Sequence, residues 1–175
     1  MGKTEKAPKA LLFQAATVND VRLFDAIEKL LLRYHGKMVL TYGPYLFDDF
    51  STYYAPEMGK GLQKKFYFFE VPVSLENVYR YKLGSQMMES LFVRNGKRRL
   101  NLDPGYLTLY QFSLLTTKAF SHRSYLAEGI YTECTLIAQG NDFVPLPWTY
   151  PDYKTPEALA LFRDMKKVLK RRLRD

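Results

Sequence analysis

Residues 98–153 have the sequence RRLNLDPGYLTLYQFSLLTTKAFSHRSYLAEGIYTECTLIAQGNDFVPLPWTYPDY, a run of strand-like segments separated by turn signals. Asp103-Pro104-Gly105 has the composition of a type II turn, and residues 106–117 predict the strand that follows it. Ala127-Glu128-Gly129 suits a three-residue hairpin loop, which places Arg123 opposite Glu133 and Ser124 opposite Thr132. Gly140-Asn141 suits a second hairpin. Residues 121–146 are therefore predicted to form an antiparallel meander.

The residues before this stretch alternate between strand and helix signals. Residues 10–17, 37–47 and 65–73 are apolar or aromatic runs of strand length, the second interrupted at Gly43-Pro44. Thr17 or Asn19 is expected to cap a helix whose buried stripe is Val21, Phe24, Ile27, Leu31 and Tyr34. Ser74 is expected to cap a second helix that is closed by Asn95 and Gly96 and uses Met87 and Met88 as core filler. Between the second and third strands, residues 48–65 predict a long ordered loop with one helical turn.

After Trp148 the chain is rich in proline and then enters its last helix, which Thr155 is placed to cap and Pro156 to begin. The resulting order is β-α-β, long loop, β-α-β, meander, helix. It predicts one α+β domain over residues 10–175, with a ferredoxin-like split βαβ core extended by an antiparallel β-meander and a C-terminal helix. Residues 1–9 are predicted to be a flexible basic N-terminus.

The formal net charge of +8 is concentrated at the two ends of the chain. Residues 1–9 contribute +2 and residues 163–175 contribute +5, which leaves +1 for residues 10–162. A basic terminal helix is compatible with RNA or an acidic partner, and equally with a solvated face. The charge alone therefore does not identify a partner.

Several functional classes are not expected. No apolar run reaches the length of about 18 residues that spans a bilayer, and MGKTEKAPK has no following signal-peptide hydrophobic stretch. The only cysteine, Cys134, has no partner for a disulfide, fits a small buried hydrophobe, and agrees with a cytoplasmic location. The turn after the first strand has no glycine, which argues against a Rossmann or Walker phosphate loop.

Five side chains within 26 positions are candidate cations: Arg98, Arg99, Lys118, His122 and Arg123. Charge-assisted hydrogen bonds from such groups suit phosphate or carboxylate recognition, and His122 is the candidate general acid or base. The other residues assigned to this site are Asn101, Asp103, Tyr53, Tyr54 and Glu133. The alternative is that Arg123 only pairs with Glu133 across the hairpin, while the other cations are solvated.

The sequence identifies no cofactor and predicts no metal site. His122, Asp103 and Glu133 are of ligand type, but no His-x-His, His-Glu-x-x-His or closely spaced carboxylate pair is present. Residues 148–153, WTYPDY, suit either stacking on a base or a strap laid over the core, and aromatic side chains between prolines favour the strap.

Five segments carry a family resemblance: DFSTYYAPEMGKGL (49–62), NLDPGYLTL (101–109), TTKAFSHRSYL (116–126), GIYTECTL (129–136) and PWTYPDY (147–153). With them the chain resembles, from about residue 8 to 170, a bacterial and archaeal domain family of unknown function. The resemblance implies a stand-alone cytoplasmic protein, and it transfers no activity. Some relatives are labelled GTP-binding, but no nucleotide motif here matches that label. Members often have an acidic residue where this chain has Thr52, which weakens a carboxylate site in the loop.

Two hypotheses follow. The first is a ligand-binding or enzymatic domain that recognises a small anionic compound, such as a nucleotide or phosphate ester, near His122 and Arg123. The second is a non-catalytic structural or interaction module whose basic last helix contacts RNA or an acidic partner. A pocket among the site residues favours the first hypothesis, and cross-strand pairing of every charged residue favours the second. The sequence does not determine the oligomeric state.

Overall fold

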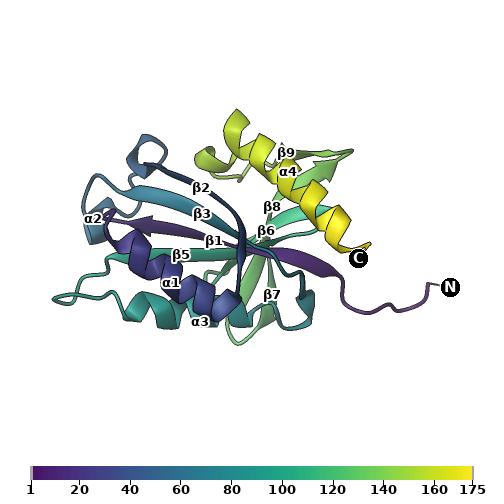
Figure 1. Cartoon of the computed structure of the whole chain (residues 1–175), viewed down its shortest axis with the longest axis horizontal. Coiled ribbons are helices and arrows are strands. Elements are labelled where there is room, and N and C mark those ends of the chain that lie inside the picture. Colours follow the sequence, from purple (N-terminus) through teal and green to yellow (C-terminus); the bar gives the residue numbers. More distant parts are fainter. Residues whose placement is uncertain (1, 175) are drawn as a thin grey trace.

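The computed structural model describes residues 2–174, which form one sheet with helices on both of its faces (Figure 1). The strands are β1 (Lys9–Val18), β2 (Met38–Leu46), β3 (Gln63–Phe69), β4 (Val73–Ser74), β5 (Leu100–Leu107), β6 (Gln111–Thr116), β7 (Arg123–Ala127), β8 (Ile130–Gln139) and β9 (Asp142–Pro145). The α-helices are α1 (Leu23–His35), α2 (Ala55–Met58), α3 (Arg80–Ser90) and α4 (Pro156–Arg172), and 3-10 helices span Phe47–Asp49, Leu75–Asn77 and Pro151–Tyr153. None of the described helices combines the length and the apolar character that crossing a lipid bilayer requires.

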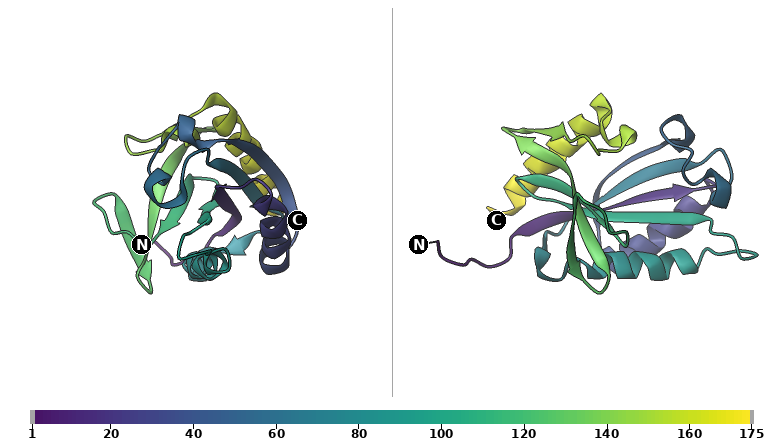
Figure 2. Two further views of the ribbon diagram at one scale, coloured as in Figure 1. Left: turned by 90° about the vertical axis from the view of Figure 1, so that its left-hand side faces the viewer. Right: turned by 180° about the vertical axis from the view of Figure 1, so that it is seen from behind.

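The two ends of the chain lie at the same end of the molecule (Figures 1 and 2). The residues before β1 run along the outside, and the Pro8 carbonyl accepts a hydrogen bond from the Leu75 N–H (3.1 Å). In the end-on view of Figure 2 the two termini lie on opposite sides of that end, so the two basic segments share an end of the molecule without being in contact.

The first half of the chain confirms the predicted α+β class. The strand order across the sheet begins β2-β3-β1-β5, and each neighbouring pair is antiparallel. β1 and β2 are therefore parallel with β3 between them, so α1 forms a crossover connection. α3 forms the second crossover, from β3 to β5. This order of elements is that of the predicted ferredoxin-like core.

The second half of the chain extends the same sheet through β6, β8 and β7. The predicted pairs Arg123–Glu133 and Ser124–Thr132 are present between β7 and β8. The hairpin loop has two residues rather than three, because Ala127 pairs with Ile130. Both loop residues, at 128 and 129, have positive φ, which is the conformation of a type I′ turn. β9 pairs with the end of β8 beyond the Gly140-Asn141 turn, as predicted.

The predicted turn at Asp103-Pro104-Gly105 is wrong, because these residues lie inside β5. β6 pairs with β5 only from Gly105 onward, so Pro104 lies where β5 has β1 on one edge and no strand on the other. A proline without an N–H is tolerated at such a position. Gly105 is required by packing, since a Cβ there would collide with the Phe13 ring and the Ser113 carbonyl. The chain turns instead at residues 108–110, where the Thr108 N–H bonds the Gln111 carbonyl (2.9 Å).

Side chains of α3 cover the part of the β5 edge that β6 leaves open. The Glu89 carboxylate accepts a hydrogen bond from the Leu102 N–H (2.6 Å), and the Lys82 ammonium donates to the Leu102 carbonyl (2.8 Å). Both backbone groups of Leu102 are thereby satisfied without a strand partner. Burial raises the pKa of Glu89. α3 thus takes the place of a strand beside the first residues of β5.

The start of α1 differs from the sequence prediction. The helix begins at Leu23, and neither Thr17 nor Asn19 caps it. The Asp20 carboxylate instead accepts a hydrogen bond from the Arg22 N–H (3.1 Å). Thr17 remains within β1, because the strand continues to residue 18.

The helix before β5 also differs from the prediction. Ser74 caps the 3-10 helix that precedes α3, through the Glu76 N–H, and not α3 itself. Asn95 and Gly96 form a tight turn of their own after the helix has ended. Met87 is 70% exposed and is therefore not core filler, whereas Met88 is buried.

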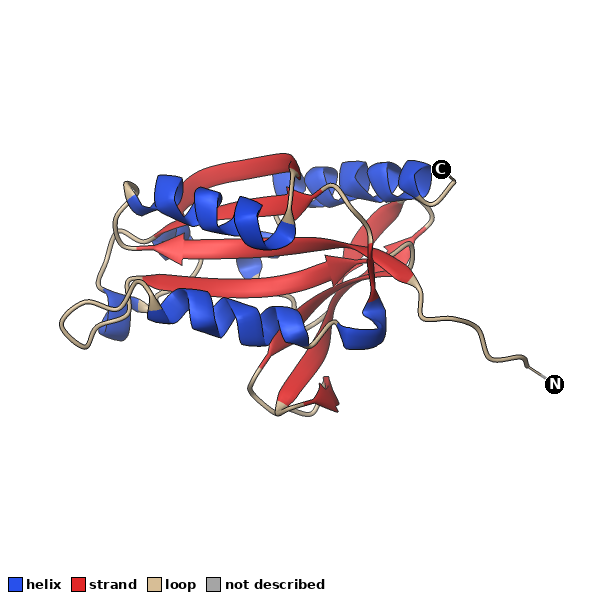
Figure 3. Cartoon of the chain, turned by 60° about the horizontal axis from the view of Figure 1, so that its bottom comes forward, coloured by secondary structure: helices blue, strands red, loops and turns tan. Residues whose placement is uncertain are grey.

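α1 and α3 lie side by side on one face of the sheet, with α4 behind it (Figure 3). Phe24, Ile27 and Leu31 of α1 are buried as predicted, whereas Val21 and Tyr34 at the ends of the predicted stripe are exposed. The three buried residues of α1 pack on residues that alternate along the strands: Leu12, Ala16 and Val18 of β1, Tyr67 and Phe69 of β3, and Leu100 and Leu102 of β5. This α1–α3 face is one of the two main cores.

α4 begins as predicted, with the Thr155 side chain as its cap and Pro156 in its first turn. Its buried residues Leu161, Phe162, Met165 and Leu169 cover the opposite face of the sheet, which we call the α4 face. Phe112 stacks on Phe13 of β1 (4.3 Å between ring centroids) and packs against Phe162 of α4 (4.2 Å). Aromatic burial of this kind is the main source of stability for the second core.

Candidate functional site

α4 covers only part of the α4 face, and two irregular segments cover the rest. Residues 47–62, which we call the tyrosine loop, confirm that an ordered loop lies between β2 and β3, but the loop ends before Gln63, where β3 begins, and contains two short helices rather than the predicted single helical turn. Residues 146–155, which we call the strap, place Tyr153 against Phe66 of β3 (5.2 Å between centroids). We call the area beneath these two segments the polar half of the face, because its strand positions carry charged and hydroxyl side chains.

Strand register aligns these side chains in rows. Thr17 of β1 is opposite Lys64 of β3 and Asn101 of β5. In the next row on the same face, Ala15 of β1 is opposite Phe66 of β3 and Asp103 of β5. The row after that crosses six strands, from β3 to β7, and consists of Phe68, Phe13, Gly105, Leu114, Glu133 and Arg123. Because side chains two residues apart share a face of a strand, Lys64, Thr17, Asn101, Asp103 and Glu133 all lie on the α4 face.

On the β5 side the site is a chain of hydrogen bonds. Arg98 donates to the Asn101 side-chain oxygen (3.1 Å) and to the Glu57 carboxylate (2.7 Å). Asn101 donates in turn to Asp103 (2.7 Å). The Arg98 guanidinium also lies over the Tyr54 ring, 5.5 Å from its centroid. The tyrosine loop is thus attached to the start of β5.

On the β8 side the site is built on the buried carboxylate of Glu133, whose side chain is 2% exposed. Its Oε2 atom accepts hydrogen bonds from Arg123 Nε (2.8 Å) and from His122 Nε2 (3.1 Å). The same guanidinium donates to the Lys118 carbonyl (3.0 Å) and to the Tyr150 hydroxyl (3.3 Å). Arg123 therefore joins the hairpin, the segment after β6 and the strap.

The tyrosine loop connects the two sides. Tyr53 and Tyr54 pack edge to face with centroids 5.0 Å apart, and the Lys118 ammonium bonds the Tyr53 hydroxyl. Nine of the ten residues assigned to the site from sequence form one contact network: Arg98, Asn101, Asp103, Tyr53, Tyr54, Lys118, His122, Arg123 and Glu133. They come from segments separated by up to 80 positions, and only the fold brings them together.

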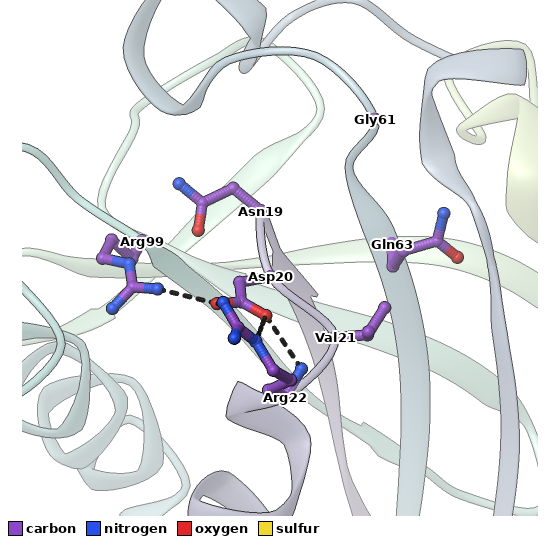
Figure 4. Close-up of a pocket in the computed structure, with 7 residues that line it drawn as sticks. All are labelled: Asn19, Asp20, Val21, Arg22, Gly61, Gln63 and Arg99. Carbon is purple, nitrogen blue, oxygen red and sulfur yellow. Dashed lines mark hydrogen bonds and ion pairs between the residues drawn. The ribbon is translucent and has the colours of Figure 1, made fainter.

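The tenth residue, Arg99, lies elsewhere. It donates to Asp20 (3.1 Å) in an open depression of about 520 Å³ at the start of α1 (Figure 4). Arg22 binds the same carboxylate at 2.9 Å, and hydrogen bonds from Arg22 lower the pKa of Asp20 to about 2. Both guanidinium groups are therefore paired with Asp20, and Arg99 does not contribute to the network on the α4 face. Neither this depression nor a smaller one of about 200 Å³ between β9 and α4 is lined by any of the other nine residues, so these two depressions do not provide the pocket that the first hypothesis expects.

Aromatic side chains surround the cations at the surface. Tyr53 is 61% exposed, Phe120 65%, Tyr150 42% and Trp148 37%. The Trp148 indole stacks on the His122 ring, with centroids 4.8 Å apart and an angle of 17° between the planes. Its N–H donates to the carbonyl of Cys134, a half-buried strand residue (2.8 Å). The strap prediction holds for buried Tyr153, while Trp148 and Tyr150 remain accessible.

The polar half also contains a buried ion pair that the sequence does not predict. Lys64 and Asp152, 4% and 2% exposed, form a salt bridge of 2.6 Å, and the Tyr45 hydroxyl donates to the same carboxylate (2.9 Å). The Lys64 ammonium is also close to the rings of Phe47 (4.9 Å) and Tyr153 (4.6 Å). Asp152 lies in the strap motif, but nothing in the sequence around Lys64 marks it as buried, because lysine in a strand ordinarily faces solvent.

No group of three or more histidine, cysteine, aspartate or glutamate side chains within residues 2–174 is arranged to hold a metal ion. Glu133 is bound by Arg123 and His122, Glu57 by Arg98, and Asp103 by the Asn101 amide. Ligand recognition through charge-assisted hydrogen bonds and aromatic stacking is the chemistry that this arrangement offers.

Residues 8–168 match the sequence profile of a family described only as a domain of unknown function. No curated protein and no solved structure matches the chain significantly.

Proposed function

We propose that this chain, which belongs to the family described as Domain of unknown function (DUF4416), binds a small anionic ligand with an aromatic ring, such as a nucleotide. The site is the corner formed by Lys118, His122 and Arg123 with the exposed rings around them. The observation that carries the proposal is the exposure of Tyr53, Phe120, Trp148 and Tyr150 next to these cations. Clustered exposed aromatic side chains are uncommon on a monomer surface and mark binding sites.

The charges at this corner support an anionic ligand. Lys118 is exposed, and the Tyr53 hydroxyl is its hydrogen-bond partner on the tyrosine loop. A phenol is a weaker acceptor than a phosphate or carboxylate oxygen, because the latter carry a full negative charge. An anion would displace the Tyr53 hydroxyl from Lys118, and the tyrosine loop would then act as a lid.

His122 is the residue of this site suited to proton transfer. The ionised Glu133 carboxylate accepts only, so Nε2 of His122 is the nitrogen that donates to it. In the neutral ring this leaves Nδ1 as an acceptor, the arrangement of a general base oriented by a carboxylate. If binding leads to catalysis, His122 is the residue we assign to it. A cytoplasmic location suits such a ligand, and the unpaired Cys134 is compatible with a reducing compartment.

The test is isothermal titration calorimetry with AMP, phenyl phosphate and inorganic phosphate. AMP and phenyl phosphate should bind more tightly than inorganic phosphate, because only they carry a ring. Lys118→Met should remove a charge-assisted hydrogen bond of about 1.5–3 kcal/mol, a loss of roughly ten- to hundredfold in affinity. Phe120→Ala should weaken AMP and phenyl phosphate but not inorganic phosphate.

The matched control is Lys167→Met, which removes an exposed cation on α4 that pairs with Asp164 (2.7 Å). This variant should bind like the wild type. If neither AMP nor phenyl phosphate binds the wild-type protein, or if Lys167→Met weakens binding as much as Lys118→Met does, the proposal is wrong.

A second candidate function concerns the basic ends of the chain, for which we propose RNA as the partner. Its support is that the N-terminal segment and the end of α4 lie at the same end of the molecule (Figures 1 and 2). Within residues 2–174, Lys3, Lys6, Arg171 and Arg174 have no carboxylate within 4.0 Å, which agrees with a contact to phosphates.

Fluorescence anisotropy with a short single-stranded RNA at low and high salt tests this candidate. Binding should weaken steeply as salt rises, because counterion release drives it. The double variant Arg171→Gln with Arg174→Gln should weaken RNA binding. Point substitutions are preferable to removal of residues 166–175, because that deletion would also remove the buried Leu169 and destabilise the fold. Binding to an acidic peptide but not to RNA would contradict the assignment of the partner.

A further inference from the structure

We propose that the ligand also carries hydroxyl groups, as the ribose of a ribonucleotide does, and that the polar half of the α4 face binds them through Asp103 and Glu133. This inference rests on the proposed function and concerns the inner part of the same site. The outer corner offers cations and rings, whereas the inner part offers hydrogen-bond acceptors that have no partner in the protein.

The first observation is the free oxygen of Glu133. Both protein partners of this carboxylate, Arg123 and His122, bind Oε2. The other oxygen, Oε1, is buried and has no hydrogen-bond partner. A buried carboxylate oxygen without a donor is unfavourable, because it has lost the water that solvated it. Oε1 of Glu133 is therefore an acceptor that no donor in the described protein fills.

Two further buried hydroxyl groups on the same face have no partner. Thr17 Oγ1 lies in the row between Lys64 and Asn101, on a residue with no exposed surface. The Tyr153 hydroxyl belongs to a strap residue that is 1% exposed. In most folded proteins such groups are satisfied, so several on one side of a sheet indicate missing partners.

Asp103 lies among these groups and connects them to solvent. It is one row from Thr17 and Asn101, on the same face, and its side chain is 28% exposed. Its protein donors are Asn101 at 2.7 Å and the more distant Lys82 at 3.7 Å, which leaves acceptor capacity on the carboxylate. A ligand at the surface therefore reaches an acceptor at Asp103.

Tyr54, Tyr150 and Tyr153 lie near Asp103 in this inner part. Burial raises the pKa of Tyr54 and of Tyr153, and the negative charge of Asp103 raises both further. Burial also raises the pKa of Tyr150, to which the Glu133 and Asp103 carboxylates add. The Tyr150 hydroxyl bonds Arg123 (3.3 Å), so this residue lies between the outer cations and the inner carboxylates. Tyr150 therefore links the two parts of the proposed site.

The donor and acceptor pattern defines the ligand class. Lys118 and Arg123 at the rim suit a phosphate, and the exposed rings suit an aromatic base. Two carboxylates with free acceptor positions suit hydroxyl groups, because a carboxylate accepts hydrogen bonds from the two hydroxyls of a ribose diol. A ligand group that lacks an O–H or N–H forms no hydrogen bond with them. A ribonucleoside monophosphate combines all three features.

The experiment compares AMP, 2′,3′-dideoxy-AMP and phenyl phosphate by titration calorimetry. Wild-type protein should bind AMP at least tenfold more tightly than the dideoxy compound, because only AMP has the diol. Asp103→Asn, a change of equal size, should reduce affinity for AMP about tenfold and leave the dideoxy compound and phenyl phosphate unaffected. Glu133→Gln should act in the same direction if it folds.

Asp142→Asn is the control, because Asp142 is an exposed carboxylate of β9 that pairs with Arg163 (3.3 Å). It should leave all three affinities unchanged. If the dideoxy compound binds as tightly as AMP, or if Asp103→Asn leaves AMP binding intact, water fills the inner part and the inference is overturned, while phenyl phosphate binding still supports the proposed function. If none of the three compounds binds, the proposed function and this inference both fall.

Discussion

The two halves of the α4 face are built from the same strands but hold opposite chemistry. Beneath α4, Phe13, Phe112 and Phe162 pack ring against ring, and the apolar surface buried there stabilises the fold. Beneath the tyrosine loop and the strap, β3 and β8 bury Lys64 and Glu133 instead. Burying charge is unfavourable even when it is paired, so stability alone does not account for the polar half. The apolar half therefore maintains the fold, and the polar half is where we propose that a ligand binds.

The largest expected effect comes from breaking the ion pair of the polar half. Asp152→Ala leaves the Lys64 ammonium buried without a carboxylate, and removal of one partner of a buried pair costs about 3–5 kcal/mol. Urea unfolding followed by circular dichroism measures the loss. The double change Lys64→Met with Asp152→Leu should recover most of it, because an apolar pair of similar volume avoids burying charge. A loss below about 1 kcal/mol for the single variant would show that the pair is solvated.

A change in the apolar half should affect stability and spare the site. Leu169 of α4 is fully buried, and Leu169→Ala should destabilise the protein by about 2–5 kcal/mol through lost burial and the cavity left behind. The affinity of the remaining folded protein for phenyl phosphate should not change. If that affinity falls in parallel with stability, the two halves are coupled and the division between them is wrong.

The α1–α3 face contains a small buried polar cluster of Gln14, Ser85 and His35, which should make the stability of this face depend on pH. Gln14 donates to the Ser85 hydroxyl (2.9 Å) and contacts His35 Nε2 (3.1 Å), and His35 Nδ1 is buried without a partner. Burial lowers the pKa of His35 from 6.5 to about 4. The unfolded chain therefore binds a proton at a higher pH than the native protein does, so stability is complete above pH 6.5 and falls as the pH drops toward 4.

The expected decrease is about 3 kcal/mol, since each pKa unit corresponds to about 1.36 kcal/mol. Urea unfolding at several pH values in this range measures it. The matched variant His35→Gln removes the titrating group, so the difference between wild type and variant isolates His35 from the carboxylates that also titrate near pH 4. Equal pH dependence of both proteins would contradict the assignment.

The smallest expected effect on stability is that of Tyr53→Phe in the polar half. The ring is 61% exposed, so loss of its hydroxyl should change the free energy of unfolding by no more than about 0.5 kcal/mol. Affinity for inorganic phosphate should nevertheless rise a few-fold, because Lys118 no longer has to give up its bond to Tyr53. Weaker phosphate binding in this variant would show that the hydroxyl contacts the ligand rather than competing with it.

Local signals in the sequence predicted much of the fold. The β7–β8 register followed from the hairpin composition, because a turn and period-two alternation specify which residues face each other. The start of α4 followed from Thr155 and Pro156, whose capping chemistry depends only on neighbouring residues. Asp103-Pro104-Gly105 has the composition of a turn, yet it lies within β5, and composition does not show which strands lie beside these residues. Only the sheet shows that Pro104 lies where no donor is needed and that Gly105 makes room for Phe13.

The candidate site shows the same division. Sequence composition pointed to the residue types of the network, and hairpin pairing predicted the contact between Arg123 and Glu133. Composition could not separate Arg99 from Arg98, because what distinguishes them is their partners. Arg98 binds Glu57 and Arg99 binds Asp20, and both carboxylates lie far away in the sequence. Composition also missed Lys64, whose burial depends on Asp152, 88 positions later.

The sequence by itself determined the α+β class, the order of strands and helices, the hairpin register and the set of cationic side chains from which the proposed site is drawn. These properties depend on periodicity, turn chemistry and residue type, all of which act over a few neighbouring positions. The tertiary structure decided which half of the α4 face is polar, which cations share a site and which buried oxygens lack a partner. Those properties depend on contacts between residues far apart in the chain, and the folded sheet alone determines them.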